Sequence, residues 1–204
     1  MITVVDYGMG NLRNVMRACA EIGVRASVTS DPDVVRDAGW LILPGVGAFG
    51  EAMRKIEELG LRDAIVGHAA AGRPLLGICL GMQLFLDSSE ESPGVTGLQL
   101  ISGVVRKLDG GVKVPHIGWN DVMPLSPSPL FPDPEEKPVT YFVHSFYVGL
   151  IPETVAVTEY GVRYSASVRK GNVYGVQFHP EKSQVAGLNL LRRFTLIKPA
   201  AWSE

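Results

Sequence analysis

The chain has 204 residues, of which 46% are hydrophobic, so it can bury the core of one domain covering residues 1–204. Its 19 basic and 21 acidic residues give a formal net charge of -2 without a basic block, which argues against a nucleic-acid partner. Residues 1–5 lack the features of a secretory signal, and the apolar run 75–86 is too short and glycine-interrupted to span a bilayer. We therefore expect a cytoplasmic protein that does not associate with a membrane.

The first half of the chain alternates short runs rich in Val and Ile with helical patterns, which predicts βαβ units and a parallel sheet. The expected strands are residues 2–5, 24–28, 40–43 and 75–78. The expected helices are residues 12–20, 51–59, 62–71 and 80–86.

The second half reads as strands joined by turns, closed by a final helix over residues 183–197. The expected strands are residues 103–108, 140–148, 155–160, 164–170 and 173–178. Between them, residues 124–138 contain six of the 14 prolines, which bar this segment from a central strand and predict a surface loop.

The strongest local motif is G-I-C-L-G at residues 77–81, which has the form of a nucleophile elbow with cysteine in place of serine. In such an elbow the central residue projects from a sharp strand-to-helix turn, and small residues two positions away let the chain pass closely. Cys79 would lie at a helix N-terminus, where the partial positive charge favours a thiolate. The amide of Leu80 would point at a developing oxyanion.

Two cysteines are too few for a disulfide framework, so each is judged by its surroundings. A free cysteine is commonly a small buried hydrophobe, and Cys19, between two alanines in an amphipathic helical pattern, fits that role. For Cys79 the elbow reverses this preference and favours a nucleophile.

A thiolate nucleophile needs a base, and of the four histidines only His179 has a carboxylate, Glu181, two positions away. In an extended backbone both side chains project to the same side, and Pro180 restricts φ between them. A carboxylate beside the imidazole selects its tautomer and stabilises the imidazolium, which completes a Cys, His, Glu triad. An isolated H-P-E run is more often a strand-end histidine with a solvated glutamate, but the upstream elbow favours the triad.

The other histidines give weaker signals. His68 lies among alanines in a helical pattern and is expected at the surface. His116 and His144 flank predicted loops near the sheet edge, and either could act as the base instead. No pair of histidines has zinc-ligand spacing, so we expect neither a metal nor a cofactor.

Two glycine-rich segments follow predicted strands. Gly8 and Gly10 are similar to a dinucleotide-binding turn, but Arg13 stands where the third glycine is needed, so we reject nucleotide binding. In P-G-V-G at residues 44–47, the glycines would let backbone amides approach a substrate carbonyl or would simply form a tight turn. The residues alone favour neither the substrate-facing amides nor the tight turn.

Together, G-I-C-L-G-M-Q at residues 77–83 and V-Q-F-H-P-E-K-S at residues 176–183 resemble the triad glutamine amidotransferases. Four further motifs, at residues 6–12, 44–47, 115–120 and 141–147, are similar to the glutaminase subunits of imidazole glycerol phosphate synthases within that superfamily. The resemblance spans nearly the whole chain. It implies a flavodoxin-like, doubly wound α/β fold with a mostly parallel sheet and an additional antiparallel region.

The resemblance also implies roles for individual residues. Cys79 would attack the side-chain amide of glutamine to form a glutamyl thioester, and His179, oriented by Glu181, would protonate the departing ammonia. The residues expected to hold the substrate are Gly47, Gln83 and, through backbone groups, Ser145 and Phe146. The expected oxyanion donors are the amides of Val46, Gly47 and Leu80.

A partner is expected because ammonia released into water is largely protonated and no longer nucleophilic. The resemblance implies a heterodimer with a (β/α)8-barrel cyclase subunit, which joins the ammonia to a phosphorylated ribulosyl precursor in histidine biosynthesis. We expect the face that carries Cys79 to dock on this subunit through four residues, two of them aromatic and of the types that anchor interfaces. These are Asn11, Trp119, Asn120 and Tyr141.

Two other functions are open from the residues alone. One is a free-standing cysteine peptidase or hydrolase of similar fold, against which Gln83 and the position of the H-P-E run argue. The other is a regulatory subunit that kept the fold but lost activity, against which the intact triad argues.

Overall fold

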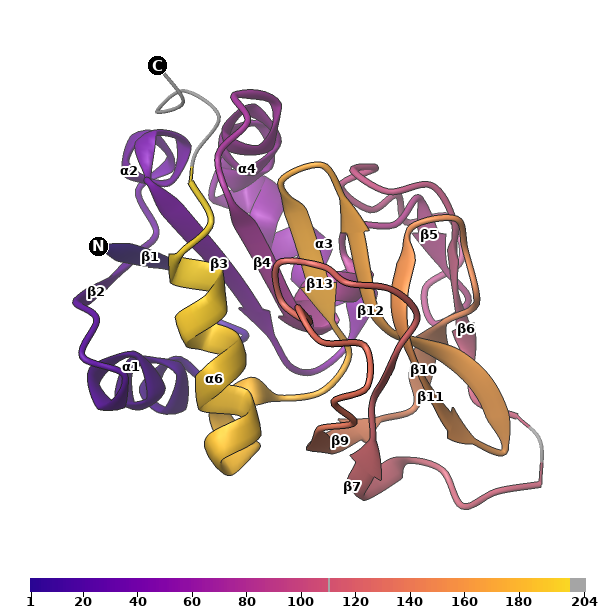
Figure 1. Ribbon diagram of the computed structural model, residues 1–204. Coiled ribbons are helices and arrows are strands. Elements are labelled where there is room, and N and C mark those ends of the chain that lie inside the picture. Colours follow the sequence, from indigo (N-terminus) through magenta and orange to yellow (C-terminus); the bar gives the residue numbers. More distant parts are fainter. Residues whose placement is uncertain (110, 199–204) are drawn as a thin grey trace.

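The computed structural model describes residues 1–109 and 111–198, and its centre is an eight-stranded mixed sheet (Figure 1). The parallel half consists of β1 (Ile2–Val5), β2 (Ala26–Thr29), β3 (Trp40–Gly45), β4 (Leu75–Cys79) and β13 (Val173–Val176). The antiparallel half consists of β8 (Met123–Pro124), β11 (Thr154–Tyr160) and β12 (Val162–Lys170). The strand order is β2-β1-β3-β4-β13-β12-β11-β8, which confirms the predicted mostly parallel sheet with an antiparallel region.

Helices cover both faces of the parallel half of the sheet, and its central strands are therefore buried on both sides. One face packs against α1 (Leu12–Glu21) and α6 (Gln184–Thr195), and the other against α2 (Pro32–Asp37), α3 (Phe49–Glu58) and α4 (Leu61–Ala70). In Figure 1, α6 lies in front of the sheet and α3 behind it. Within the described ranges, no helix has the length and apolar character needed to cross a membrane.

The helix α2 was not predicted, although its start carries a local signal. Asp31 accepts hydrogen bonds from the amides of Asp33 and Val34, and Pro32 occupies the first turn. An aspartate followed by proline is a favourable helix start, because the carboxylate satisfies free amides and proline lacks one.

Two smaller sheets flank the central one. Antiparallel strands β7 (His116–Asp121) and β9 (Val139–His144) form the first, and β10 (Phe146–Val148), β6 (Val104–Lys107) and β5 (Ser88–Ser89) form the second. The single strand predicted for residues 140–148 is therefore wrong. It is broken at Ser145, because the residues before it pair with β7 and those after it pair with β6.

The helix after Cys79 is also shorter than predicted. It is α5 (Leu80–Gln83) rather than residues 80–86. The carbonyls of Leu84 and Phe85 accept hydrogen bonds from the amides of Leu98 and Leu100 in a later loop, which ends the helix. A four-residue helix has a small dipole, so the first-turn amides are the stronger electrostatic influence on Cys79. Most other predicted elements differ at their ends by at most two residues.

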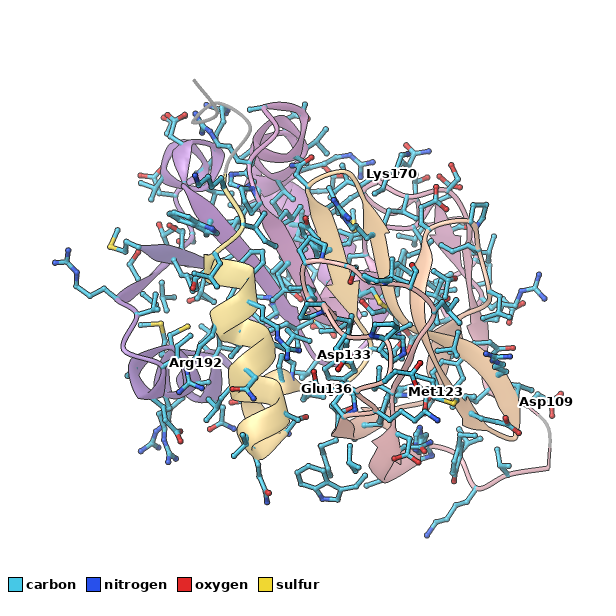
Figure 2. All side chains as sticks on the ribbon, in the orientation of Figure 1. Asp109, Met123, Asp133, Glu136, Lys170 and Arg192 are labelled. Atoms are coloured by element: carbon cyan, nitrogen blue, oxygen red, sulfur yellow. The ribbon has the colours of Figure 1, made fainter. Side chains whose placement is uncertain are left out.

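The proline-rich segment 124–138 is only partly the surface loop that its composition predicts. Pro124 ends the edge strand β8, where a missing donor is tolerated. Leu130 and Phe131 are buried against the core, and Glu136 beside α6 pairs with Arg193 at 2.8 Å (Figure 2). The loop therefore closes one side of the core.

The sheet joins strands from residue 2 to residue 176, so the residues that carry the candidate site belong to one continuous layer. A single domain over residues 1–204 stays a prediction, and residues 110 and 199–204 of it lie outside the described residues.

Candidate active site

Cys79 lies at the tip of the predicted elbow, between β4 and α5, with φ 55° and ψ -110°. This is a strained conformation for a residue with a side chain. A methyl group on Gly81 would lie 1.9 Å from the Leu43 carbonyl oxygen, and one on Gly77 would lie 2.7 Å from the Gly81 carbonyl oxygen. The turn thus requires both glycines, for the steric reason that the motif predicts.

A cavity of about 310 Å³ opens above Cys79. It brings together seven of the predicted residues, namely Val46, Gly47, Cys79, Leu80, Gln83, Phe146 and His179. His144, weighed above as an alternative base, also lines the cavity, and the three further lining residues were not predicted, namely Glu91, Val143 and Lys182. Ser145 lies between two lining residues without being one of them.

The imidazole of His179 is held by Glu181, as predicted, with Nδ1 2.8 Å from Oε1. Their side chains are 2% and 1% exposed. The backbone between His179 and Glu181 differs from the prediction, because Pro180–Lys182 forms a short 3-10 helix and is not extended. Ser183 stabilises this turn by donating its hydroxyl to the His179 carbonyl.

The charge state of His179 depends on its two neighbours. Burial by itself would lower the pKa of this imidazole, but the nearby Cys79 and the hydrogen bond to Glu181 raise it to about 10. Because Nδ1 is bound to Glu181, Nε2 is the nitrogen left to act at Cys79, and it has no hydrogen-bond partner among the described residues. The surroundings of His179 therefore favour the protonated imidazole, which can give a proton to a leaving group.

Gln177 was missed by sequence reasoning and lies against the nucleophile. Its Nε2 is 3.6 Å from Sγ of Cys79, and its Oε1 accepts a hydrogen bond from Nε2 of Gln83 at 3.0 Å. Nε2 of Gln83 also donates to the Phe146 carbonyl at 2.8 Å. Since a carbonyl only accepts, this contact fixes both amide groups and aims the Gln177 donor at the sulfur. In the sequence, the position of Gln177 two residues before His179 was the signal that could have identified it.

The predicted oxyanion segment is only partly in place. The amide of Val46 donates to the Met9 carbonyl at 3.1 Å, so in this conformation it does not point at the substrate. Gly47 has φ 95°, and a methyl group there would lie 2.7 Å from the end of Met9. The prediction that Val46 supplies an oxyanion amide therefore does not describe this state, because the loop after β1 holds that amide.

Glu91 is a second lining residue that the sequence did not indicate. Its carboxylate accepts a hydrogen bond from the Phe49 amide at 2.7 Å, and the Ser92 hydroxyl accepts one from the Gly50 amide at 3.0 Å. The first residue of α3 is preceded by Ala48, which offers no side-chain cap. Two residues from a distant loop thus cap the helix that follows the P-G-V-G segment.

The remaining histidines are structural. His68 is fully buried with Nε2 3.1 Å from the Pro74 carbonyl, so the expected surface position is wrong: α4 turns this side chain toward the core. Nitrogens of His116 and His144 are bound to Tyr164 and to the Phe146 carbonyl, which removes both as the base. Among the residues that the structure describes, no group of three or more His, Cys, Asp or Glu side chains could hold a metal.

Of the four predicted docking residues, Asn120 is placed differently from the other three. Trp119 and Tyr141 are cross-strand neighbours on β7 and β9 with ring centroids 5.9 Å apart, and Trp119 is 48% exposed. Asn11 precedes α1 at the carboxyl end of β1, and Cys79 lies at the carboxyl end of the parallel strand β4, so both are at the same end of the sheet. Asn120 lies on the other face of β7 and donates to the Glu159 carbonyl, so it does not share the Trp119 face.

Comparison with known proteins places nearly the whole chain in one family. Residues 3–197 match the family Glutamine amidotransferase class-I. The chain is 49% identical over 198 residues to the imidazole glycerol phosphate synthase subunit HisH of Methanothermobacter thermautotrophicus, covering 97% of this chain and 98% of that one. It is 47% identical to the subunit of the same name from Moorella thermoacetica, covering 95% and 93%.

Solved structures share the fold at lower identity. A crystal structure of a glutamine amidotransferase superimposes with a TM-score of 0.75 at 20% identity, covering 95% of this chain and 97% of that one. PurLQS from Thermotoga maritima gives a TM-score of 0.76 at 22% identity, covering 95% and 96%.

Proposed function

The chain belongs to the class-I glutamine amidotransferase family, and we propose that it works as the glutaminase subunit of an imidazole glycerol phosphate synthase. The observation that carries the mechanism is that the strained Cys79 elbow and His179 line one cavity, with Glu181 buried against His179. No cofactor is needed for the chemistry that these side chains provide.

In the first step, the thiolate of Cys79 attacks the side-chain amide carbon of glutamine. The carbon–nitrogen bond breaks, and His179 gives its Nε2 proton to the leaving nitrogen, which departs as ammonia and leaves a glutamyl thioester. In the second step, His179 takes a proton from water as that water attacks the thioester, which releases glutamate and restores the thiolate. Glu181 keeps the imidazole in the tautomer and orientation that both steps require.

The hydrogen-bond pattern limits how glutamine binds. Both amide hydrogens of Gln83 are used by Phe146 and Gln177, so its Oε1 is the atom that serves the substrate. The Ser145 carbonyl accepts from the Leu108 amide, and the Phe146 carbonyl already has two donors. We infer that this segment holds glutamine through its amides, together with Gly47. The cavity is near the lower end of small-molecule site volumes, which suits a single amino acid.

The partner is proposed to be a (β/α)8-barrel cyclase subunit, in the setting of cytoplasmic histidine biosynthesis. Ammonia needs a route that avoids water, so the partner must cover the sheet edge that carries Cys79. Near this end of the sheet, the exposed Trp119 packs against the half-buried Tyr141, and Asn11 follows β1 at the same end. Aromatic pairs of this kind anchor protein interfaces.

The direct test is Cys79→Ala in the assembled complex. Glutamine-dependent product formation should fall by at least about 1,000-fold, because the nucleophile is lost, whereas turnover with an added ammonium salt should persist. Cys19→Ala is the matched control, since Cys19 is buried in α1 away from the cavity. Substantial glutamine hydrolysis by the Cys79 variant would refute the proposal.

A further inference from the structure

Behind the cavity, a buried row of hydrogen-bonded side chains joins three strands, β7, β12 and β9, whose places in the fold Figure 1 shows. The hydroxyl of Tyr164 lies 2.9 Å from Nδ1 of His116 and 3.0 Å from Nε2 of His144. Nδ1 of His144 lies 2.9 Å from the Phe146 carbonyl. All three side chains are buried, and the triad chemistry uses none of them.

The direction of each hydrogen bond follows from the chemistry of the atoms. The Phe146 carbonyl only accepts, so His144 carries a proton on Nδ1. Burial and the neighbouring His116 lower the pKa of His144 to about 3, so the ring is neutral and its Nε2 is a bare acceptor. The Tyr164 hydroxyl must therefore donate to His144, and its oxygen accepts from Nδ1–H of His116.

This row reaches the wall of the cavity at the Phe146 carbonyl, which is linked to Cys79 through Gln83 and Gln177. That oxygen receives one donor from His144 and one from Gln83, which uses both of its lone pairs. Through Gln83 the carbonyl sets the orientation of the Gln177 amide, whose nitrogen lies 3.6 Å from Sγ of Cys79. A change in the His144 tautomer would place a bare nitrogen against the carbonyl and push this wall of the cavity out of position.

We propose that Tyr164 is a positioning residue of the glutaminase site: its hydroxyl donates to Nε2 of His144 and fixes the ring, and Nδ1–H of His144 thereby holds the Phe146 carbonyl at the cavity wall. The proposal rests on the glutaminase function proposed above. It adds a specific task for a side chain that contacts neither the substrate cavity nor the triad hydrogen bonds.

Tyr164→Phe isolates this task, because the ring keeps its packing against Phe142 and Tyr147 and loses only the hydroxyl. Tyr160→Phe is the matched control. Tyr160 stacks on His116 with centroids 4.0 Å apart, but its hydroxyl donates outward to the Lys113 carbonyl. Both variants thus lose one tyrosine hydroxyl from the same aromatic cluster, and only one breaks the row.

The first measurement is the histidine tautomer in the wild-type full chain, from long-range proton–nitrogen NMR correlations. We expect the His144 ring to be neutral at neutral pH, with its proton on Nδ1. In Tyr164→Phe we expect the proton to stay on Nδ1, which the Phe146 carbonyl holds, and the Nε2 resonance to shift because that nitrogen has lost its donor. An unchanged Nε2 resonance in this variant would overturn the proposal. A wild-type His144 protonated on Nε2, or on both nitrogens, would overturn the proposal whether or not the protein hydrolyses glutamine.

The second measurement is steady-state kinetics of the complex with the cyclase. Tyr164→Phe should lower kcat/KM for glutamine by about tenfold, the effect of one lost buried hydrogen bond, with ammonium-dependent turnover unchanged. Tyr160→Phe should match wild type. Wild-type kcat/KM in Tyr164→Phe would also overturn the proposal. If the wild-type complex itself hydrolyses no glutamine, the proposed function fails, and the NMR comparison of wild type with Tyr164→Phe still decides whether Tyr164 holds the His144 ring.

Discussion

The amide nitrogen of Val46 lies 3.1 Å from the carbonyl oxygen of Met9 and donates a hydrogen bond to it. This bond ties the P-G-V-G segment to the loop after β1, two residues before Asn11. The amide that the resemblance assigns to the oxyanion is therefore occupied. Gly45 and Gly47 flank Val46, and glycine tolerates the backbone angles that a peptide reorientation would need.

We predict that the isolated subunit hydrolyses glutamine slowly and accelerates when the cyclase and its ligand are added. Loss of one oxyanion donor typically costs about 100-fold to 1,000-fold in rate, which sets the expected size of the activation. Partner binding would shift the population toward the state in which the Val46 amide is released. Equal turnover by the free subunit and the ligand-bound complex would contradict this gating.

Trp119→Ala should weaken that activation without altering the triad. The indole is 48% exposed and packs against Tyr141, so its loss removes contact area from the docking face. Leu196→Ala is the control, because Leu196 is also exposed but follows the far end of α6. The readout is the ratio of glutaminase rates with and without the cyclase, and an unchanged ratio in the Trp119 variant would exclude this residue from the interface.

Glu181→Gln should lower kcat for glutamine less than His179→Ala does, because Glu181 orients the base while His179 transfers the protons. The carboxylate also raises the pKa of His179, so the Gln variant should titrate its imidazole at lower pH than wild type. Histidine NMR titration and single-turnover kinetics measure the two effects. Equal or reversed losses, in variants whose circular dichroism shows a native fold, would contradict the assigned roles.

Gly81→Ala should prevent the native turn, since its methyl group would lie 1.9 Å from the Leu43 carbonyl oxygen and backbone atoms cannot yield that far. We expect the free energy of unfolding to drop by about 3 kcal/mol or more, the range of severe overpacking. Gly149→Ala is the control, because a methyl group there meets no heavy atom within 4 Å. Urea unfolding of both variants checks the difference, and similar losses would show that the elbow is not sterically closed.

Stability should fall as the pH drops from about 6.5 toward about 3, the ordinary and the folded pKa of His144. In that window the unfolded chain binds more protons than the folded one, so the free energy of unfolding rises with pH by up to about 1.4 kcal/mol per pH unit for one such group. His116 and His179 face His144 and lower its pKa further. His144→Gln should flatten the slope below pH 6.5 and leave it unchanged above, as measured by urea unfolding.

The sequence by itself determined the features that depend on near neighbours in the chain. The elbow at Cys79 follows from the G-I-C-L-G motif, because a methyl group on Gly77 would lie 2.7 Å from the Gly81 carbonyl oxygen within the same turn. The contact of His179 with Glu181 follows from a separation of two residues, and it formed even though the backbone between them is a 3-10 turn. The alternation of apolar strands and helices predicted the parallel half of the sheet, but not the order of its strands.

Only the tertiary structure decided the features whose partners are distant in the chain. The end of α5 depends on amides in the loop after residue 96, and the break at Ser145 depends on two different partner strands. The donor aimed at Cys79 comes from Gln177, and the Val46 amide is held by Met9. Such hydrogen bonds leave no periodic signal, because they arise when folding brings together groups that must be satisfied once buried.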